Sequence, residues 1–550
     1  MKTAASPTVG RYALLLTSAI LFPLTLPSPL FSYGNALLGA ISLVPLYLFI
    51  VETSETRTLL RGGALFGTVS TIIANFWLAF FQDFSVWTLG GATFGYLIYN
   101  TILFAFLGLI RRRTPVYRPF LFVLVWVGYE YLKSVGFLGY PWGLAAYALS
   151  AHPLALQLAE ITGVWGISAA VVLFSALVAE GIAQFYLERR NVALRLALFA
   201  GALPLILWGY GLYAQERAVT VKREIGLLLV QQNVDSWEPG NFAGALARAQ
   251  DLSKRGLAEA PGPVDLVVWS ETSLRRPYEE EEWRVYYEEN PVEQPFSQFL
   301  GELGRPLLTG SPVVGEHGYM NGVLLLDSSG EILGKYGKQQ LVPFAERVPF
   351  WEQEAVKRFF SQVIGLEAAW VPGGSSEPVE IPVPGEEPLP AGSPICFEDA
   401  FTGVVGEMVE EGATALINLT NNSWSRSDSA QIQHFAAARF RSIEYRIALA
   451  RSTNSGITTV IDAHGRRGEE LPMFEAGAMY ARLPVYEGVG ETPYARLGPW
   501  LPALALLATA LLLLRERSAG NSPTRFFRIQ KKDDQPRGRS SHFSNRNRSP

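Results

Sequence analysis

Apolar residues are distributed unevenly along this chain, and that unevenness limits its fold more than any other feature. Eight apolar segments lie near the two ends, and each is close to the roughly 17–25 residues with which a helix crosses a lipid bilayer. They cover residues 11–30, 34–51, 62–82, 88–110, 117–132, 158–185, 193–213 and 497–514. Residues 218–485 instead have the charge density and alternating apolar runs of a water-soluble α/β domain. We therefore predict an α-helical membrane bundle of about eight spans joined to a soluble α/β domain.

This distribution predicts four parts. We expect a seven-helix transmembrane region at 1–216, a soluble catalytic domain at 217–488, an eighth transmembrane helix at 489–515 and a basic disordered tail at 516–550. Because Ser, Asn and Gly separate the many Arg and Lys residues of the tail, we expect it to lie solvated near anionic lipid rather than to bind nucleic acid.

The arginines between the apolar segments predict the orientation in the membrane. They cluster in alternate connections, whereas the opposite connections offer only Lys133. The clusters are Arg57 with Arg61, then Arg111, Arg112, Arg113 and Arg118, then Arg189, Arg190 and Arg195. Because basic loops stay in the cytoplasm, both termini should be cytoplasmic and the soluble domain should lie outside.

One outside connection, residues 135–152, is itself apolar, aromatic and interrupted by Gly and Pro. Trp and Tyr residues of such a loop settle at the membrane–water interface. Two interpretations stay open for it: simple interfacial anchoring, or a role in admitting a lipid.

Cys396 is the only cysteine among the 550 residues, so no intrachain disulfide can form. It ends a short predicted strand, and a helix is predicted to follow at 401–411. That arrangement would aim the sulfur at a helix N-terminus, which favours the nucleophilic thiolate. The alternative is that Cys396 is a small buried apolar residue with no chemical role.

The soluble part is predicted to alternate strands with helices. We expect strands at 224–232, 264–269, 306–314, 322–327, 331–336, 413–419, 447–452 and 457–462, and helices at 242–259, 401–411 and 431–445. Such an order predicts an αββα sandwich, in which two sheets are covered by helices. The five histidines are scattered without a metal-ligand spacing, so we expect neither a metal site nor a cofactor.

Three residues of complementary chemistry come just after predicted strands: the acid Glu271, the amine Lys338 and the thiol Cys396. Their order resembles the Glu-Lys-Cys triad of the nitrilase superfamily. The resemblance extends over five segments: Val268-Trp269-Ser270-Glu271; Gly334 to Lys338 with Leu341 to Glu346; Ile395-Cys396-Phe397-Glu398; Asn418 to Trp424; and Arg451 to Ile457. Combined with the predicted spans, it resembles the apolipoprotein N-acyltransferases, a membrane-embedded branch of that superfamily.

This resemblance implies a role for each member of the triad. Acyl transfer needs a nucleophile, a base and a group that stabilises the oxyanion. Cys396 would attack an acyl ester and Glu271 would accept the thiol proton. Lys338 would stabilise the oxyanion together with the amide that follows Cys396.

The resemblance also implies supporting or substrate-binding residues. They are Trp237, Glu346, Phe397, Glu398, Asn422 and Trp424. Two departures concern substrate preference. Phe397 stands where family members often have Tyr, and Asn422-Ser423-Trp424-Ser425 replaces a pattern usually written Asn-Asp-small-Trp-Phe.

The implied activity is lipoprotein maturation at a bacterial inner membrane. A phospholipid would donate an acyl chain to Cys396, and the α-amino group of a diacylated apolipoprotein would accept it; membrane lipid is the implied surrounding. Two alternatives stay open: a membrane-tethered amidohydrolase that uses water, and a non-catalytic receptor or scaffold.

Overall fold

The computed structural model describes residues 7–81, 85–217, 219–235, 242–289, 294–364 and 370–518. The chain divides into two compact units, Met1–Thr509 and Ala510–Pro550. The fold and the site described below belong to the first unit, apart from the end of the last helix.

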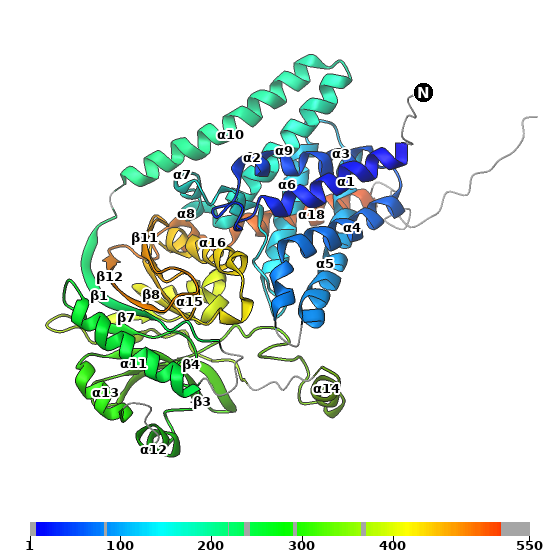
Figure 1. Cartoon of the computed structure of the whole chain (residues 1–550). Coiled ribbons are helices and arrows are strands. Elements are labelled where there is room, and N and C mark those ends of the chain that lie inside the picture. The colour runs from blue at the N-terminus through cyan, green and yellow to red at the C-terminus, as the bar shows by residue number, and fades with distance from the viewer. Residues whose placement is uncertain are drawn as a thin grey trace, which may run out of the picture. The chain divides into compact units, whose positions relative to one another are not determined.

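The apolar segments fold as helices (Figure 1). These are α1 (Pro7–Leu24), α2 (Ala36–Ser42), α3 (Val44–Glu52), α4 (Thr56–Ala74), η1 (Phe76–Phe80), α5 (Ser85–Leu107), η2 (Ile110–Arg112), α6 (Arg118–Ser134), η3 (Ala145–Leu149), α7 (Pro153–Leu156), α8 (Ala159–Thr162), α9 (Val164–Tyr186), α10 (Arg190–Glu216) and α18 (Trp500–Ser518). By length and composition, three described segments can cross a membrane: Val86–Arg112, Val164–Tyr186 and Arg190–Glu216. Shorter apolar helices cover Val9–Leu24, Ala36–Glu52 and Trp500–Leu514. The count of eight spans therefore stays a prediction.

Several of the predicted segments are interrupted, and two of the breaks have a clear local cause. Within 34–51, helix α3 restarts after Leu43 with a proline in its first turn, where the missing N–H costs nothing. Within 158–185, α8 and α9 are separated by Gly163, which has a left-handed φ of 63°. A Cβ at Gly163 would lie 2.4 Å from the Tyr494 ring, so only glycine fits this break.

The soluble part contains two sheets, as predicted, and each has six strands. The first has the order β12-β1-β2-β3-β4-β5 and the second β11-β10-β9-β8-β7-β6. The strands are β1 (Val221–Gln231), β2 (Leu266–Val268), β3 (Leu307–Gly315), β4 (Gly318–Leu326), β5 (Ile332–Gly337), β6 (Val379–Ile381), β7 (Leu389–Gly392), β8 (Ala415–Thr420), β9 (Leu449–Thr453), β10 (Thr459–Ile461), β11 (Arg467–Glu470) and β12 (Gly477–Tyr486). The sequence pattern did not predict β6, β7, β11 or β12 as strands.

Strand β1 shows how the layers are held. Its side chains alternate between two faces, and from Ile225 to Gln231 both faces are buried. Leu227 and Leu229 belong to the core between the sheets, whereas Leu228 and Val230 pack under α11 (Phe242–Glu259) and α13 (Phe296–Leu303). The hydroxyl of Ser452 in β9 contacts the carbonyls of Val230 (3.2 Å) and Val268 (3.1 Å), which links the two sheets.

Further helices complete the domain. They are α12 (Glu281–Glu289), α14 (Glu354–Phe359), η4 (Phe360–Ile364), η5 (Cys396–Ala400), α15 (Thr402–Glu410), η6 (Ser423–Ser425), α16 (Asp428–Tyr445) and α17 (Pro493–Leu497). Helix α16 is buried from Ser429 to Tyr445. It contributes Phe435, Phe440 and Ile443 to the core that contains the second sheet.

Candidate active site

The only cysteine lies on a strained turn after a strand-like residue. Ile395 forms an isolated parallel bridge to Leu419, and Cys396 then opens η5 with a left-handed φ of 53°. The Asn418 side chain donates hydrogen bonds to the carbonyls of Pro394 and Cys396, both at 2.9 Å. Left-handed backbone in a residue other than glycine is costly, and the surrounding bonds hold it in place. Cys396 is thus the first residue of the short 3₁₀ helix η5. The helix predicted at 401–411 follows as α15 and begins at Thr402.

Glu271 and Lys338 meet directly, although 67 positions separate them. The ammonium of Lys338 lies 3.4 Å from Oε1 of Glu271 and 2.8 Å from Oε1 of Glu346. Asn321 of β4 donates to both carboxylates, at 2.8 Å and 3.0 Å. The second oxygen of Glu271 accepts the backbone N–H of Asn421 at 2.7 Å. Glu271, Lys338 and Asn321 are buried, so this cluster is shielded from water.

Electrostatics connects Cys396 to this cluster. Burial raises the pKa of the Cys396 thiol well above its ordinary value, and the negative charge of Glu271 adds to the rise. The Lys338 charge and the backbone N–H of Phe397 act in the opposite direction. Burial by itself would lower the pKa of Lys338, but the carboxylates of Glu346 and Glu271 outweigh it and raise that pKa. The resting site thus holds a neutral thiol beside a charged amine, and the thiol needs a base in order to react.

Glu398 is fully buried and links two loops of the site. Its carboxylate accepts the backbone N–H groups of Ile395 (2.7 Å), Gln339 (2.7 Å) and Gln340 (2.9 Å), and the hydroxyl of Tyr336. Burial raises the pKa of Glu398 to about 7. The residue therefore fixes the loop after Lys338 against the turn that carries Cys396.

The aromatic residues predicted near the site take different places. The Phe397 ring lies over Lys338, with the ammonium 5.4 Å from the ring centroid. Trp424 packs against Phe81, which follows η1 in the helical region, with the ring centroids 5.1 Å apart. Trp237 lies outside the described residues.

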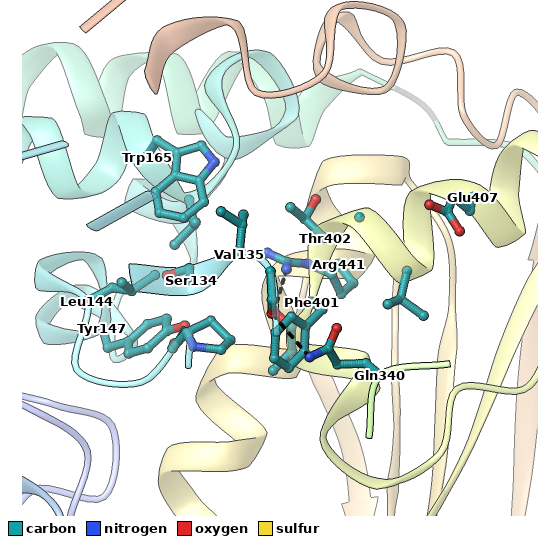
Figure 2. A pocket seen from close by; sticks show the side chains of 16 residues that line it. Ser134, Val135, Leu144, Tyr147, Trp165, Gln340, Phe401, Thr402, Glu407 and Arg441 are labelled. Atoms are coloured by element: carbon teal, nitrogen blue, oxygen red, sulfur yellow. Dashed lines mark hydrogen bonds between the residues drawn. The ribbon is translucent and has the colours of Figure 1, made fainter. Parts of the chain in front are cut away.

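A cavity of about 220 Å³ adjoins the far side of the cysteine turn (Figure 2). Trp165, Leu144 and Tyr147 of the helical region line one side, while Phe401 and Arg441 of the soluble domain line the other. Glu271, Lys338 and Cys396 are not among its lining residues. The cavity is thus separate from the cluster of charged residues.

Four further site residues are not predicted by the sequence pattern. Asn321 bridges the two carboxylates, and Asn418 holds the cysteine turn. Asp399 and His434 are hydrogen-bonded to each other, with 2.8 Å between Oδ1 of Asp399 and Nε2 of His434, and His434 also contacts Asn422. A polar residue inside an otherwise apolar strand is the one available signal, and it applies to Asn321 and Asn418. Among the described residues, no group of three or more His, Cys, Asp or Glu side chains is placed to hold a metal ion.

Comparison with known proteins agrees with this arrangement. The family model of the apolipoprotein N-acyltransferase N-terminal domain matches residues 18–177, and that of the carbon-nitrogen hydrolases matches residues 229–493. Apolipoprotein N-acyltransferase 2 of Treponema pallidum is 37% identical over 520 residues, which cover 89% of this chain and 92% of that protein. The chain belongs to the apolipoprotein N-acyltransferase family. The resemblance predicted from the sequence motifs is confirmed.

Two other members of the family match over a similar extent. Apolipoprotein N-acyltransferase 2 of Treponema denticola is 35% identical, with 92% of this chain and 97% of that protein covered. The apolipoprotein N-acyltransferase of Borreliella burgdorferi is 29% identical, with 88% and 92% covered. This family member therefore combines a nitrilase-like carbon-nitrogen hydrolase domain with apolar helices.

Proposed function

We propose that this protein transfers an acyl chain from a phospholipid, through a thioester on Cys396, to the α-amino group of the diacylglyceryl-cysteine at an apolipoprotein N-terminus. The observation that carries the proposal is the buried contact of Glu271 with Lys338 next to the only thiol, in a chain of this family. An acid, an amine and a thiol at one point are the parts that acyl transfer through a thioester requires.

In the first half-reaction, Cys396 attacks the ester carbonyl of the phospholipid. Glu271 takes the proton of the thiol, because burial keeps that thiol neutral at rest. The charge on the carbonyl oxygen is stabilised by Lys338 and by the backbone N–H of Phe397. The C–O bond then breaks, and the lysophospholipid leaves with the proton held by Glu271.

In the second half-reaction, the α-amino group attacks the thioester. A C–N bond forms, the C–S bond breaks, and one amine proton passes through Glu271 to the sulfur. The enzyme holds the acyl chain on Cys396 between the two substrates and returns to its starting state after the second one has reacted, which makes the mechanism ping-pong. Glu346 supports it through its ion pair with Lys338, and Glu398 through the loop that it holds.

The proposed topology places both substrates within reach of the thiol. We propose that 1–216 and 489–515 form eight spans in a bacterial inner membrane, that the catalytic domain at 217–488 is extracytoplasmic, and that both termini, including the basic tail at 516–550, are cytoplasmic. The alternating arginine clusters and the three long apolar helices support this. Burying each acyl CH₂ contributes about 0.8 kcal/mol, so an apolar site beside the bilayer favours extraction of such chains.

The test is covalent labelling by a phospholipid with a radioactive acyl chain. Because Cys396 is the only cysteine, Cys396→Ala removes every thiol. We expect the wild-type protein to gain a hydroxylamine-sensitive acyl label on the peptide that contains Cys396, and the variant to gain none. A synthetic diacylated lipopeptide should then remove the label as an amide.

Two outcomes would contradict the proposal. Equal labelling of Cys396→Ala would show that the thioester is not on this residue. Release of the label mainly as free fatty acid in the presence of the lipopeptide would instead identify an amidohydrolase that uses water.

A further inference from the structure

A row of four buried polar side chains ends at the sulfur. The guanidinium of Arg451 pairs with one carboxylate oxygen of Asp399, and Nε2 of His434 lies 2.8 Å from the other. Nδ1 of His434 lies 3.1 Å from the Asn422 side-chain nitrogen, and Oδ1 of Asn422 is 4.0 Å from Sγ of Cys396. None of the four residues is more than 5% exposed, so water does not compete for these contacts.

The histidine determines where the protons lie in this row. A carboxylate paired with Arg451 accepts hydrogen bonds, so Nε2 of His434 must carry the hydrogen that points to Asp399. Burial lowers the pKa of His434 to about 4, so the ring has a single proton. Nδ1 is then a bare acceptor, and it must receive an N–H from Asn422.

Gln431 independently determines the same orientation of the Asn422 side-chain amide. Its nitrogen donates to the backbone carbonyl of Asn422 and to the Ser425 hydroxyl, both at 3.0 Å. Its oxygen therefore faces the Asn422 side-chain nitrogen, at 2.8 Å. Both N–H bonds of that amide are used, by Gln431 and His434, and only the amide oxygen remains to face Cys396.

We propose that Oδ1 of Asn422 binds the acceptor amine during the second half-reaction. This inference rests on the proposed function. In the thiol form, the S–H can donate to this oxygen; in the thioester, the sulfur has no hydrogen and the oxygen becomes a free acceptor beside the acyl group. The attacking amine donates one N–H hydrogen bond to Glu271 and a second one to Oδ1 of Asn422.

The amide oxygen favours an amine over water as the acceptor. When the nitrogen attacks, it becomes positively charged until Glu271 removes a proton, and a fixed carbonyl dipole stabilises that charge. A water molecule that loses its proton to Glu271 while attacking develops little positive charge. Asn422 therefore directs the thioester toward aminolysis.

Asp399 and His434 are positioning residues for Asn422, since His434 contacts the Asn422 side-chain nitrogen and Asp399 contacts His434. If the His434 ring lost Asp399, its proton could move to Nδ1, and the Asn422 amide would then be able to turn its oxygen away from Cys396. The ring also packs on Trp142 of the connection at 135–152, with the centroids 5.6 Å apart. The helical region thus contacts the same row.

The experiment separates the two half-reactions in single-turnover reactions with labelled phospholipid. Asn422→Leu keeps the approximate volume but removes the acceptor oxygen. We expect thioester formation to slow less than the second half-reaction, in which transfer to a diacylated lipopeptide falls about 10- to 100-fold, as for the loss of a hydrogen bond to a charged group. The share of label released as free fatty acid should rise.

His434→Gln tests the same inference through the positioning residue. We expect about a fivefold loss of transfer, with the same shift toward free fatty acid, because a neutral hydrogen bond is weaker. The matched control is His464→Gln, since His464 is also buried but bonds to Arg446 and Gln157. It should leave the ratio of amide to fatty acid unchanged.

Four results would overturn the inference. One is an unchanged ratio of amide to fatty acid in Asn422→Leu and His434→Gln, and another is equal slowing of both half-reactions. The third is a wild-type protein that forms no thioester, which would overturn the proposed function as well; normal transfer by Asn422→Leu would overturn only the inference. If Asn422→Leu does not fold, His434→Gln decides.

Discussion

Two buried clusters of charge lie in different regions of this molecule, and only one of them adjoins a nucleophile. In the first, Lys338 contacts Glu271 and Glu346 beside the neutral thiol of Cys396. That sulfur sits on left-handed backbone, and its contact with Asn422 is long. The first cluster therefore lies beside a thiol that strained backbone holds in place.

The second cluster joins the helical region to the soluble domain, and its central arginine makes several hydrogen bonds. Glu160 of α8 accepts a hydrogen bond from Nε of Arg446 at 2.9 Å. Its carboxylate also pairs with Arg217 and accepts the Tyr210 hydroxyl. Arg446 in turn donates to Gln157 and to the Ala463 carbonyl, both at 2.8 Å.

The difference between the clusters teaches that buried, paired charge does not by itself locate an active site. Both clusters pair carboxylates with cations out of water, which is how structural anchors and catalytic sites alike avoid unpaired buried ions. What distinguishes the first is a strained nucleophile at its edge. The predictions below test whether the clusters differ in function as they do in structure.

The largest expected effect is on the rate of thioester formation in Lys338→Met. Removing the ammonium takes away the main stabilisation of the oxyanion, and we expect at least about a 10³-fold loss, measured by labelling with phospholipid. Lys335→Met is the matched control, because Lys335 lies on β5, which ends just before Lys338, and pairs with Glu279 at the surface. A similar loss in both variants would show that the first cluster has no special role.

A smaller effect on activity, but a clear loss of stability, is expected for Glu160→Gln. Arg446 would be left buried without a counter-charge, which costs about 3–5 kcal/mol of unfolding free energy, measured by denaturant titration in detergent. The exposed pair of Glu224 and Arg482 provides the control, since Glu224→Gln should cost less than about 1 kcal/mol. If folded Glu160→Gln forms the thioester as slowly as Lys338→Met, the two clusters are not functionally distinct.

The sequence predicts one part of the active site much better than another. Glu271 and Lys338 could be predicted because each follows a strand, and strand ends gather ligands in α/β sheets. The contacts of Asp399 could not, because its partners His434 and Arg451 come from a helix and a strand later in the chain. The sequence around an acid just after Cys396 looks the same whether that acid caps a helix or forms a buried ion pair.

The same distinction applies to the fold. The apolar runs in β1 and β8 predict buried strands correctly, because a strand that is covered on both faces is apolar on both. The break between α8 and α9 is not predicted, since the ring that requires Gly163 belongs to Tyr494, more than 300 positions away. Features that depend on one distant partner leave no periodic signal.

The smallest expected effect sharpens the comparison through pH. The pKa of His434 is lowered by burial from 6.5 to about 4, so between these values the unfolded chain binds more protons than the folded one. The stability that comes from this histidine is therefore complete above about pH 6.5 and is lost as the pH falls toward 4, by up to about 3 kcal/mol. Denaturant titrations at pH 7 and pH 4.5 should show a smaller difference in unfolding free energy for His434→Gln than for the wild type.

The contrary outcome is an equal pH dependence in both proteins. Titration of other groups cancels in that comparison, so this outcome would mean that His434 is protonated in the folded protein at pH 4.5. A protonated ring could not accept a hydrogen bond from the Asn422 side-chain nitrogen. The Asn422 amide beside Cys396 would then have a different orientation.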